Sequence, residues 1–190
     1  MSFIIGNFFA ILLAFMRMSQ KPWLKYPARI YISFMRGVPM LVVLFILYFG
    51  LPYVGIQIPA LLCAIIGFST VSAAYMAEIF RSSISAVDKG QVGGCSISRT
   101  SSKANYSSHH FTSSPTYCSS TTCNVIIDMV KSSSLAAMIT VPDIFQNAKI
   151  IGGREYDYMS MYILIAFIYW VLSFILELLQ GQVEKRLTVY

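Results

Sequence analysis

Cysteine and histidine side chains gather in one polar stretch, where they could bind zinc. The residues of this kind are Cys95, His109, His110, Cys118 and Cys123. Structural zinc sites usually take their ligands from C-x-x-C or H-x-x-x-H pairs, and adjacent histidines seldom bind one ion. Neither spacing occurs in the sequence. The sequence therefore predicts no metal site.

Other arrangements that would support catalysis are also missing from the sequence. A membrane-embedded enzyme needs a nucleophile with a base, and the only two histidines are those of the polar stretch. No G-x-x-x-x-G-K-(S/T) loop is present, so we do not expect this chain to bind ATP or another nucleotide cofactor. Cys63 lies in an apolar block and is expected to be a small packing residue. The other three cysteines are predicted to face a reducing compartment, where disulfides are rare.

A few charged side chains lie within apolar stretches, where charge is costly and is usually functional or paired. Glu78 and Arg81 stand three residues apart on one helical face. This spacing favours an ion pair, with the Arg81 side chain reaching toward the membrane–water interface. Lys131 either faces a translocation path and meets a substrate carboxylate, or pairs with Asp128 one turn earlier. The candidate path residues are Lys131, Ser133, Ser134 and Glu78.

The elements that hold these residues are predicted from composition. Of the 190 residues, 56% are hydrophobic and 12% are charged, and the mean hydropathy is +0.65. These values lie outside the range of soluble globular proteins, and about 20 apolar residues span a bilayer as a helix. We predict an all-α integral membrane fold in a single domain, residues 1–190, built as a five-helix bundle. The predicted helices are 3–16, 30–50, 58–80, 123–145 and 160–180, the first being the second half of a truncated spanning helix.

Basic residues predict which helix ends face the cytoplasm. They follow the first, third and fifth helices: Arg17, Lys21, Lys25, Arg29, Arg81, Lys89, Lys185 and Arg186. The link between the second and third helices, residues 49–57, contains no Lys or Arg. The positive-inside rule then places the N-terminus outside and the C-terminus and residues 93–122 in the cytoplasm. This topology accounts for the net charge of +6, which gives no indication of nucleic-acid binding.

Several motifs occur in a fixed order along these helices. Arg36, Gly37, Pro39 and Leu41 form R-G-x-P-x-L, and Ala74, Tyr75, Ala77, Glu78, Phe80 and Arg81 form A-Y-x-A-E-x-F-R. Gly90 and Gln91 follow, and Lys131, Ser133, Ser134 and Leu135 form K-x-S-S-L. With these motifs the chain resembles the permease subunits of bacterial ABC importers for polar amino acids. Arg36, Gly37 and Pro39 stand near the start of the second predicted helix, where proline is tolerated in the first turn. We expect structural roles for these three residues and for Tyr75 and Arg81.

The resemblance implies a multi-pass protein of the bacterial inner membrane that performs no covalent chemistry. Its implied partners are separate ATPase subunits that bind ATP, a second permease subunit, an extracytoplasmic solute-binding protein and membrane lipid. The binding protein is expected to dock near Ile56-Gln57 and a Gly152-Gly153 loop. In such families the loop after the third helix forms a short E-A-A-x-x-x-G helix seated in a groove of the ATPase. The corresponding residues here are Gly90, Gln91, Gly93, Gly94, Cys95 and Arg99.

Residues 93–122 depart from the family pattern, and the genetic code suggests the reason. The chain reads Gly-Gly-Cys-Ser-Ile-Ser-Arg-Thr at 93–100. A reading frame shifted by one base permits Glu-Ala-Ala-Leu-Ser-Leu-Gly at this place. The same shift over residues 109–116 permits Ile-Ile-Leu-Pro-Gln-Ala-Leu-Arg, a peptide of the kind that precedes the fourth helix. We interpret 93–122 as out-of-frame translation of a coupling loop. Ser and Thr favour caps and turns, so we predict that this loop is poorly ordered or only weakly helical and couples badly to the ATPase.

A competing hypothesis is a small membrane protein without ATP coupling, such as an ion-coupled carrier or a structural scaffold. That class predicts internal symmetry or acidic residues at the bilayer midplane, and the sequence shows neither. Within the transporter hypothesis, no residue distinguishes a basic substrate from an acidic or amide one. The choice between a homodimer and a heterodimer of permeases is likewise left open.

Overall fold

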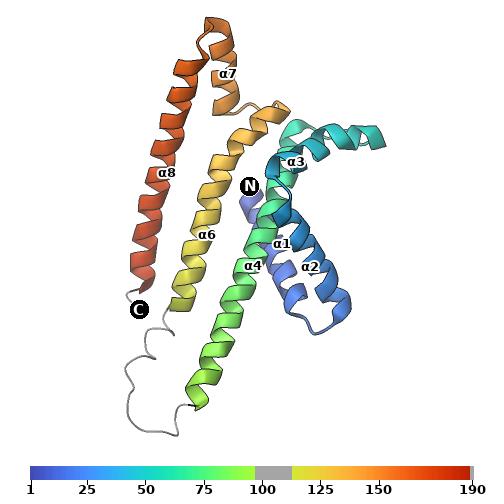
Figure 1. Ribbon diagram of the computed structural model, residues 1–190, viewed down its shortest axis with the longest axis vertical. Coiled ribbons are helices and arrows are strands. Elements are labelled where there is room, and N and C mark those ends of the chain that lie inside the picture. Colours follow the sequence, from blue (N-terminus) through green and yellow to red (C-terminus); the bar gives the residue numbers. More distant parts are fainter. Residues whose placement is uncertain (97–112, 189–190) are drawn as a thin grey trace.

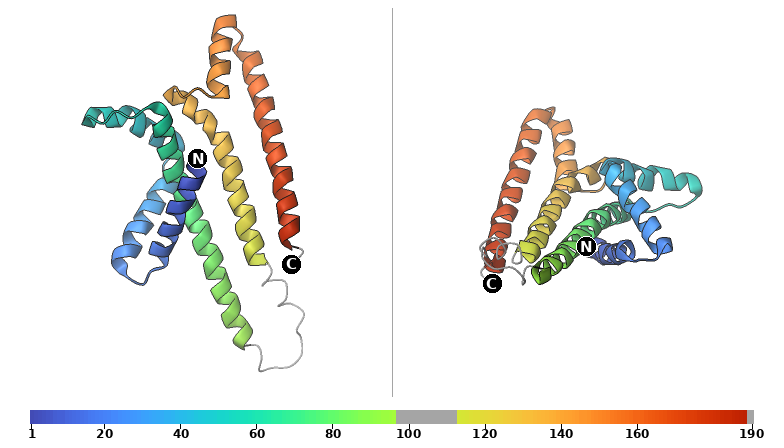
Figure 2. Two further views of the ribbon diagram at one scale, coloured as in Figure 1. Left: turned by 180° about the vertical axis from the view of Figure 1, so that it is seen from behind. Right: turned by 60° about the horizontal axis from the view of Figure 1, so that its bottom comes forward.

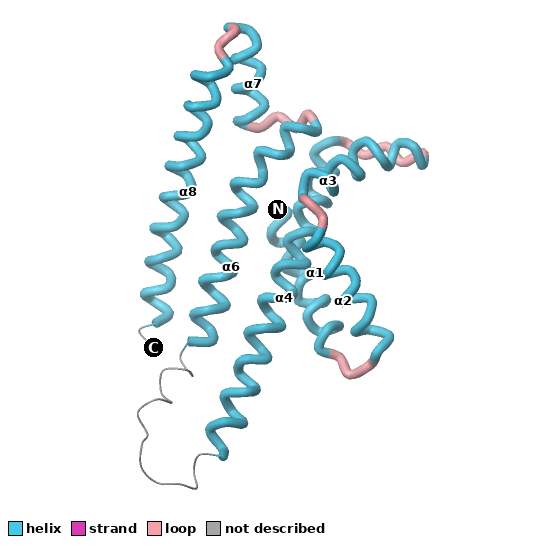
Figure 3. Tube along the Cα trace, in the orientation of Figure 1, coloured by secondary structure: helices cyan, strands magenta, loops and turns pink. Residues whose placement is uncertain are grey.

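The computed structural model describes the backbone of residues 1–96 and 113–188, and the side chains of residues 1–85 and 121–185. Within that part the regular structure is helical (Figures 1 and 3). The longer helices are α1 (Ser2–Met18), α2 (Pro22–Gly37), α4 (Ala60–Ser96), α6 (Ser113–Ser132), α7 (Ile144–Glu155) and α8 (Tyr158–Thr188). A short helix α3 (Met40–Phe45) continues through a π turn, η1 (Ile46–Gly50), and a 3-10 turn, η2 (Leu51–Val54). The chain is an all-α membrane protein, as the sequence predicts.

Helix α4 is central to the arrangement. The α1–α2 hairpin packs on one side of it and α6 on the other, and α8 lies beyond α6 (Figure 2). By length and composition, the segments Ala60–Ser85, Thr121–Ile139 and Tyr158–Lys185 could each cross a bilayer. The pair Pro22–Gly37 and Met40–Val54 could form a fourth span that bends by 104°, and α1 is a shorter apolar helix. Each predicted helix therefore has a counterpart, although several bounds differ.

Small residues allow α1 and α4 to pack closely. Gly6, Ala10 and Ala14 recur every four residues on α1 and are buried against α4. A Cβ added at Gly6 would collide with the Ser72 hydroxyl oxygen and lie 3.1 Å from the Ser69 carbonyl oxygen. Lipid tails are as apolar as the helix surfaces, so membrane helices associate largely through close van der Waals packing. Glycine at position 6 sets the distance between the two helices.

The predicted helix 30–50 is wrong as a single straight element. The chain breaks after Gly37, where Val38 is extended (φ −92°, ψ 131°) and Pro39 caps α3. Proline lacks a backbone N–H and disfavours a helical conformation in the residue before it. The first half of this span instead begins at Pro22, within the segment predicted to be a basic loop.

The predicted helix 123–145 also divides. After α6 the chain tightens into a 3-10 segment, η4 (Ser133–Ile139), and leaves it at Thr140 with φ 64°. Two serine hydroxyls donate to carbonyl oxygens three residues earlier, Ser133 to Val130 and Ser134 to Lys131, both at 2.8 Å. Such bonds compete with regular helix pairing.

The chain then forms α7, which the sequence did not predict. Gly152 and Gly153, expected in an outer loop, lie inside this helix. They face Tyr158, because an added Cβ at either glycine would come within 3.1 Å of its side chain. The prediction of a loop at Gly152-Gly153 is therefore wrong, and a binding-protein contact near these residues stays a prediction.

The segment 93–122 is helical at both ends. Helix α4 continues through Gly93, Gly94 and Cys95 to Ser96, and α6 begins at Ser113. The backbone of 93–96 and 113–122 is thus helical, contrary to the prediction of weak helix formation, and for the rest of the segment that stays a prediction. Ser and Thr cost only about 0.5 kcal/mol each relative to Ala, and extending an existing helix avoids the cost of nucleation. Residues 97–112, with Arg99, His109 and His110, lie outside the described residues.

Candidate functional site

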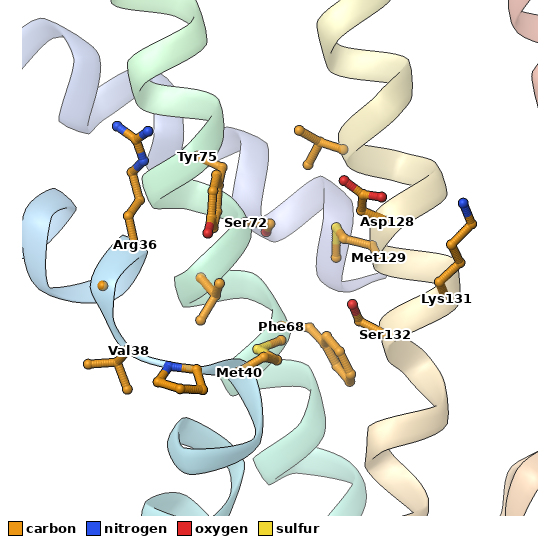
Figure 4. Close-up of a pocket in the computed structure, with 14 residues that line it drawn as sticks. Arg36, Val38, Met40, Phe68, Ser72, Tyr75, Asp128, Met129, Lys131 and Ser132 are labelled. Carbon is orange, nitrogen blue, oxygen red and sulfur yellow. The ribbon is translucent and has the colours of Figure 1, made fainter.

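A cavity of about 530 Å³ opens where the α2–α3 break faces α4 and α6. The break supplies Arg36 and Met40, and α4 supplies Phe68, Ser72 and Tyr75 (Figure 4). From α6 come Val125, Asp128, Met129, Lys131 and Ser132. Apart from Lys131, the α6 set follows the i, i+3, i+4, i+7 spacing of one helical face. The cavity thus combines an apolar wall with a few charged and hydroxyl groups, as small-molecule sites commonly do.

Two opposite charges line this cavity from different helices. The Arg36 guanidinium carbon lies 5.6 Å from the centroid of the Tyr75 ring. This cation–π contact holds the Arg36 side chain along α4. Asp128 stands on α6, with its carboxylate pointing into the space between α6 and α4 (Figure 4). In the described part of the chain, no ion pair joins Asp128 to a basic side chain.

Lys131 lies between two cavities. It contributes to the edge of the first, and its side chain projects to the side of α6 turned away from α4 (Figure 4). There it also borders a second cavity of about 330 Å³, shared with Tyr169, Trp170 and Glu177 of α8. The described side chains form no Asp128–Lys131 salt bridge, which was one of the two interpretations of Lys131.

The other predicted path residues do not line the main cavity. Ser133 and Ser134 bond to their own helix, and Ser132 takes the cavity position instead. Glu78 forms the ion pair expected from its spacing, because Arg81 donates from Nε to Glu78 Oε1 at 3.0 Å. It also pairs with Arg17 of α1. The A-E-x-F-R motif thus connects helices.

Sequence reasoning assigned purely structural roles to Arg36 and Tyr75, and did not select Ser72 or Phe68. The signal that points to them is the break at Pro39, which turns the end of α2 toward α4. No pattern within α2 alone shows that contact. Asp128 was considered only as a partner of Lys131, although an unpaired carboxylate in an apolar span is itself a functional signal.

The described side chains bear on two further predictions, which concern metal binding and the role of Cys63. In that part no group of three or more His, Cys, Asp or Glu residues could hold a metal ion. Cys63 is buried and contacts the Leu47 carbonyl oxygen at 3.5 Å, in keeping with packing. Gly90 and Gln91 lie on α4, but the surroundings of their side chains fall outside the described part.

Comparisons with known proteins decide the family. Residues 6–189 match the family described as "Binding-protein-dependent transport system inner membrane component". The chain belongs to this family. It is therefore a transmembrane permease subunit of an ATP-driven importer and a multi-pass protein of the inner membrane. Permeases of this family work with ATPase subunits and binding proteins, and are not themselves the ATPases.

Similar proteins agree with this assignment. Over 189 residues, the permease is 49% identical to the probable amino-acid ABC transporter permease protein YckA of Bacillus subtilis (strain 168), covering all of this chain and 84% of that protein. It is 37% identical over 195 residues to the L-cystine transport system permease protein TcyB of the same organism, covering all of this chain and 82% of TcyB. A crystal structure described as an amino acid ABC transporter with histidines is 33% identical, with a TM-score of 0.83. That match covers 97% of this chain and 86% of the other.

Proposed function

We propose that this permease carries an amino acid across the inner membrane and that the main cavity forms part of the path. A free amino acid presents one ammonium and one carboxylate group. Asp128 and Arg36 offer the two complementary charges from opposite walls of the cavity. The side chain of the substrate would then meet the apolar wall that includes Phe68 and Met129. The names of the similar permeases support the amino-acid class.

The observation that carries this proposal is the Asp128 carboxylate, which pairs with no described basic side chain, beside a cavity within an apolar span. A carboxylate in that position is costly unless a cation compensates it. A substrate ammonium group would supply that cation during transport. Lys131 borders the same cavity, but its side chain projects away from α4, so it would meet a substrate carboxylate or an acidic side chain there only in another rotamer.

The proposed assembly has two permease subunits, homologous or identical, beside two ATPases, with a binding protein on the outer face. Four described basic residues support the topology. Arg17 and Lys25 flank the α1–α2 turn, Arg81 lies in the later half of α4, and Lys185 lies near the end of α8; the turn and the later ends of α4 and α8 point the same way (Figure 1). The positive-inside rule makes this end cytoplasmic, with the N-terminus outside. The exposed Ile56-Gln57 link remains the proposed binding-protein contact.

ATP is proposed to bind only to the partner subunits, so this chain has no cofactor of its own and no catalytic residue. The work of ATP hydrolysis would reach it through the segment that follows Gly90 and Gln91. Residues 93–99 lack the Glu-Ala-Ala peptide of the family. We therefore propose that the chain with this sequence at residues 93–99 couples poorly to its ATPase.

Uptake of radiolabelled amino acids into proteoliposomes tests the proposed path. The test uses the complete transporter, in a version whose 93–99 peptide is restored to the family pattern so that coupling is intact. Asp128→Asn is expected to lower ATP-driven uptake about tenfold or more, because charge-assisted hydrogen bonds contribute about 1.5–3 kcal/mol. Glu155→Gln, at an exposed acid outside the cavity, is the matched control. Unchanged uptake by Asp128→Asn would remove Asp128 from the path.

A further inference from the structure

A second concave site lies at the end of the bundle where the basic residues gather. Here α1, α2 and α4 border an open pocket of about 320 Å³, which we call the basic pocket. Its lining residues are Arg17, Met18, Lys25, Arg29, Arg81 and Ser85. Four of the six are basic, and they come from three different helices. The proposed transport path does not use any of them.

Two of the four cations are held in place from within the protein. Glu78 pairs with Arg81 on its own helix and with Arg17 across the α1–α4 contact. These side chains are only 22% exposed for Arg17 and 33% for Arg81. Their guanidinium groups are therefore ordered as a wall of the pocket before any ligand arrives. Preorganised donors lose less entropy when they bind an anion.

The other two cations add charge that the described side chains do not compensate. Lys25 and Arg29 are four residues apart and so share one face of α2. Both line the pocket and both are exposed. Within the described side chains, neither forms an ion pair. The pocket therefore carries more positive than negative charge, and the ligand that it fits is an anion.

The position of the pocket relative to the membrane indicates the source of that anion. Arg81 and Ser85 are at the end of the apolar segment Ala60–Ser85, where a spanning helix leaves the hydrocarbon. Trp23 and Tyr26 of α2 are exposed at the same end of the bundle. Tryptophan and tyrosine mark the headgroup level of a bilayer. Basic pockets between membrane helices on the cytoplasmic side bind anionic lipid headgroups.

We propose that the basic pocket binds the phosphate headgroup of an anionic phospholipid. Guanidinium groups bond phosphate oxygens in a bidentate manner, and a lysine adds a point charge. Arg17 and Arg81 would hold the phosphodiester from the α1–α4 side, and Lys25 and Arg29 from α2. The lipid would thereby tie the α1–α2 hairpin to α4. A free phosphate shares this chemistry, so the test separates the two sources.

The test measures the melting temperature of the full chain in neutral detergent. Short-chain phosphatidylglycerol is titrated in, with short-chain phosphatidylcholine and inorganic phosphate in parallel. A ligand that binds only the folded state raises the melting temperature in proportion to its occupancy. The expected result is a saturable rise with phosphatidylglycerol alone. Equal rises with both lipids would overturn the proposal, and saturation by inorganic phosphate at the same concentration would overturn the lipid assignment.

Matched variants locate the site. Arg29→Gln is expected to weaken the apparent affinity for phosphatidylglycerol about tenfold, the effect of losing one charge-assisted contact. Lys21→Gln removes one charge from the neighbouring turn but not from the pocket, and is expected to leave that affinity unchanged. Arg29→Lys keeps the charge and is expected to restore most of it. If Arg29→Gln and Lys21→Gln give the same titration curve, the pocket is not the site. Melting temperatures without lipid show whether each variant is folded.

Discussion

Glu78 Oε2 lies 3.3 Å from Arg17 Nε, and this ion pair joins α4 to α1 at the end of the bundle where basic residues gather. The contact lacks the alignment of a hydrogen bond, since Glu78 Oε2 has no hydrogen-bond partner. The other carboxylate oxygen, Oε1, accepts the bond from Arg81. One carboxylate thus pairs with two guanidinium groups from different helices, a few turns before the segment proposed to contact the ATPase.

Removing that carboxylate should loosen the contact between the two helices. Glu78→Gln leaves Arg17 and Arg81 without a compensating charge. We expect the free energy of unfolding to fall by about 1–3 kcal/mol, between the values for exposed and buried ion pairs. Thermal unfolding in detergent measures the change. Glu155→Gln, at an exposed acid on α7, is the control and should melt like the parent. Equal melting of the two variants would contradict a role for Glu78 in holding α1 to α4.

Gly6 makes a separate prediction about the same helix pair. A methyl group at this position would collide with Ser72, whose hydroxyl donates to the Ser69 carbonyl oxygen at 3.1 Å. We expect Gly6→Ala to destabilise the protein by about 1–3 kcal/mol, the usual cost of overpacking. Gly181→Ala is the matched control, because nothing lies within 4 Å of an added Cβ there. That change should stabilise α8 by about 0.5–1 kcal/mol, since alanine favours a helix. The two substitutions therefore differ in sign, and a stabilising Gly6→Ala would refute the close approach.

The helical membrane fold was predictable because apolar length is a local property of the sequence. The break at Pro39 was less accessible, because a proline near a helix start fits either a first turn or a new helix after an interruption. Helix α7 was missed because Gly152 and Gly153 indicate a loop until Tyr158 packs against them.

In the candidate site, too, contacts within one helix were predictable from the sequence and contacts between helices were not. The Glu78–Arg81 pair follows from spacing within one helix, and the structure confirms it. The partner Arg17 and the facing of Arg36 toward Tyr75 depend on how separate helices pack, which no single segment specifies. Ser133 and Ser134 were selected for their polarity, but their hydroxyls are engaged by their own backbone.

The start of α8 is expected to respond to pH. The Ser160 backbone N–H donates to Asp157 Oδ1 at 3.1 Å, and bonds to Ser160 hold the pKa of the Asp157 carboxyl below its ordinary value. A lowered pKa in the folded state means that the ionised cap stabilises α8 above the unfolded pKa of about 3.9. This contribution is lost as pH falls through the lower, folded value. The protection factor of the Ser160 amide, the ratio of its intrinsic to its observed exchange rate at the same pH, should therefore fall in acid.

Two variants separate the charge from the cap. Asp157→Asn keeps an acceptor oxygen and should remove the acid dependence of the protection factor at Ser160. Asp157→Ala removes the acceptor and should accelerate exchange at every pH. If the parent and Asp157→Asn show the same pH profile, the carboxylate does not cap α8.

The segment after Gly90 and Gln91 gives the most direct functional prediction. Helix α4 already continues through Gly93, Gly94 and Cys95, so the backbone there is helical without the family peptide. Residues 93–99 lack the Glu-Ala-Ala peptide of the family, whose small side chains would allow close approach to the ATPase and whose carboxylate would add charge. We therefore expect replacement of residues 93–99 by Glu-Ala-Ala-Leu-Ser-Leu-Gly to increase both co-purification with the ATPase and ATP-driven uptake. A scrambled peptide of the same composition controls for helix propensity, because it preserves alanine and leucine content but not their order. Equal uptake by the unchanged chain and the restored chain would show that coupling does not depend on this peptide.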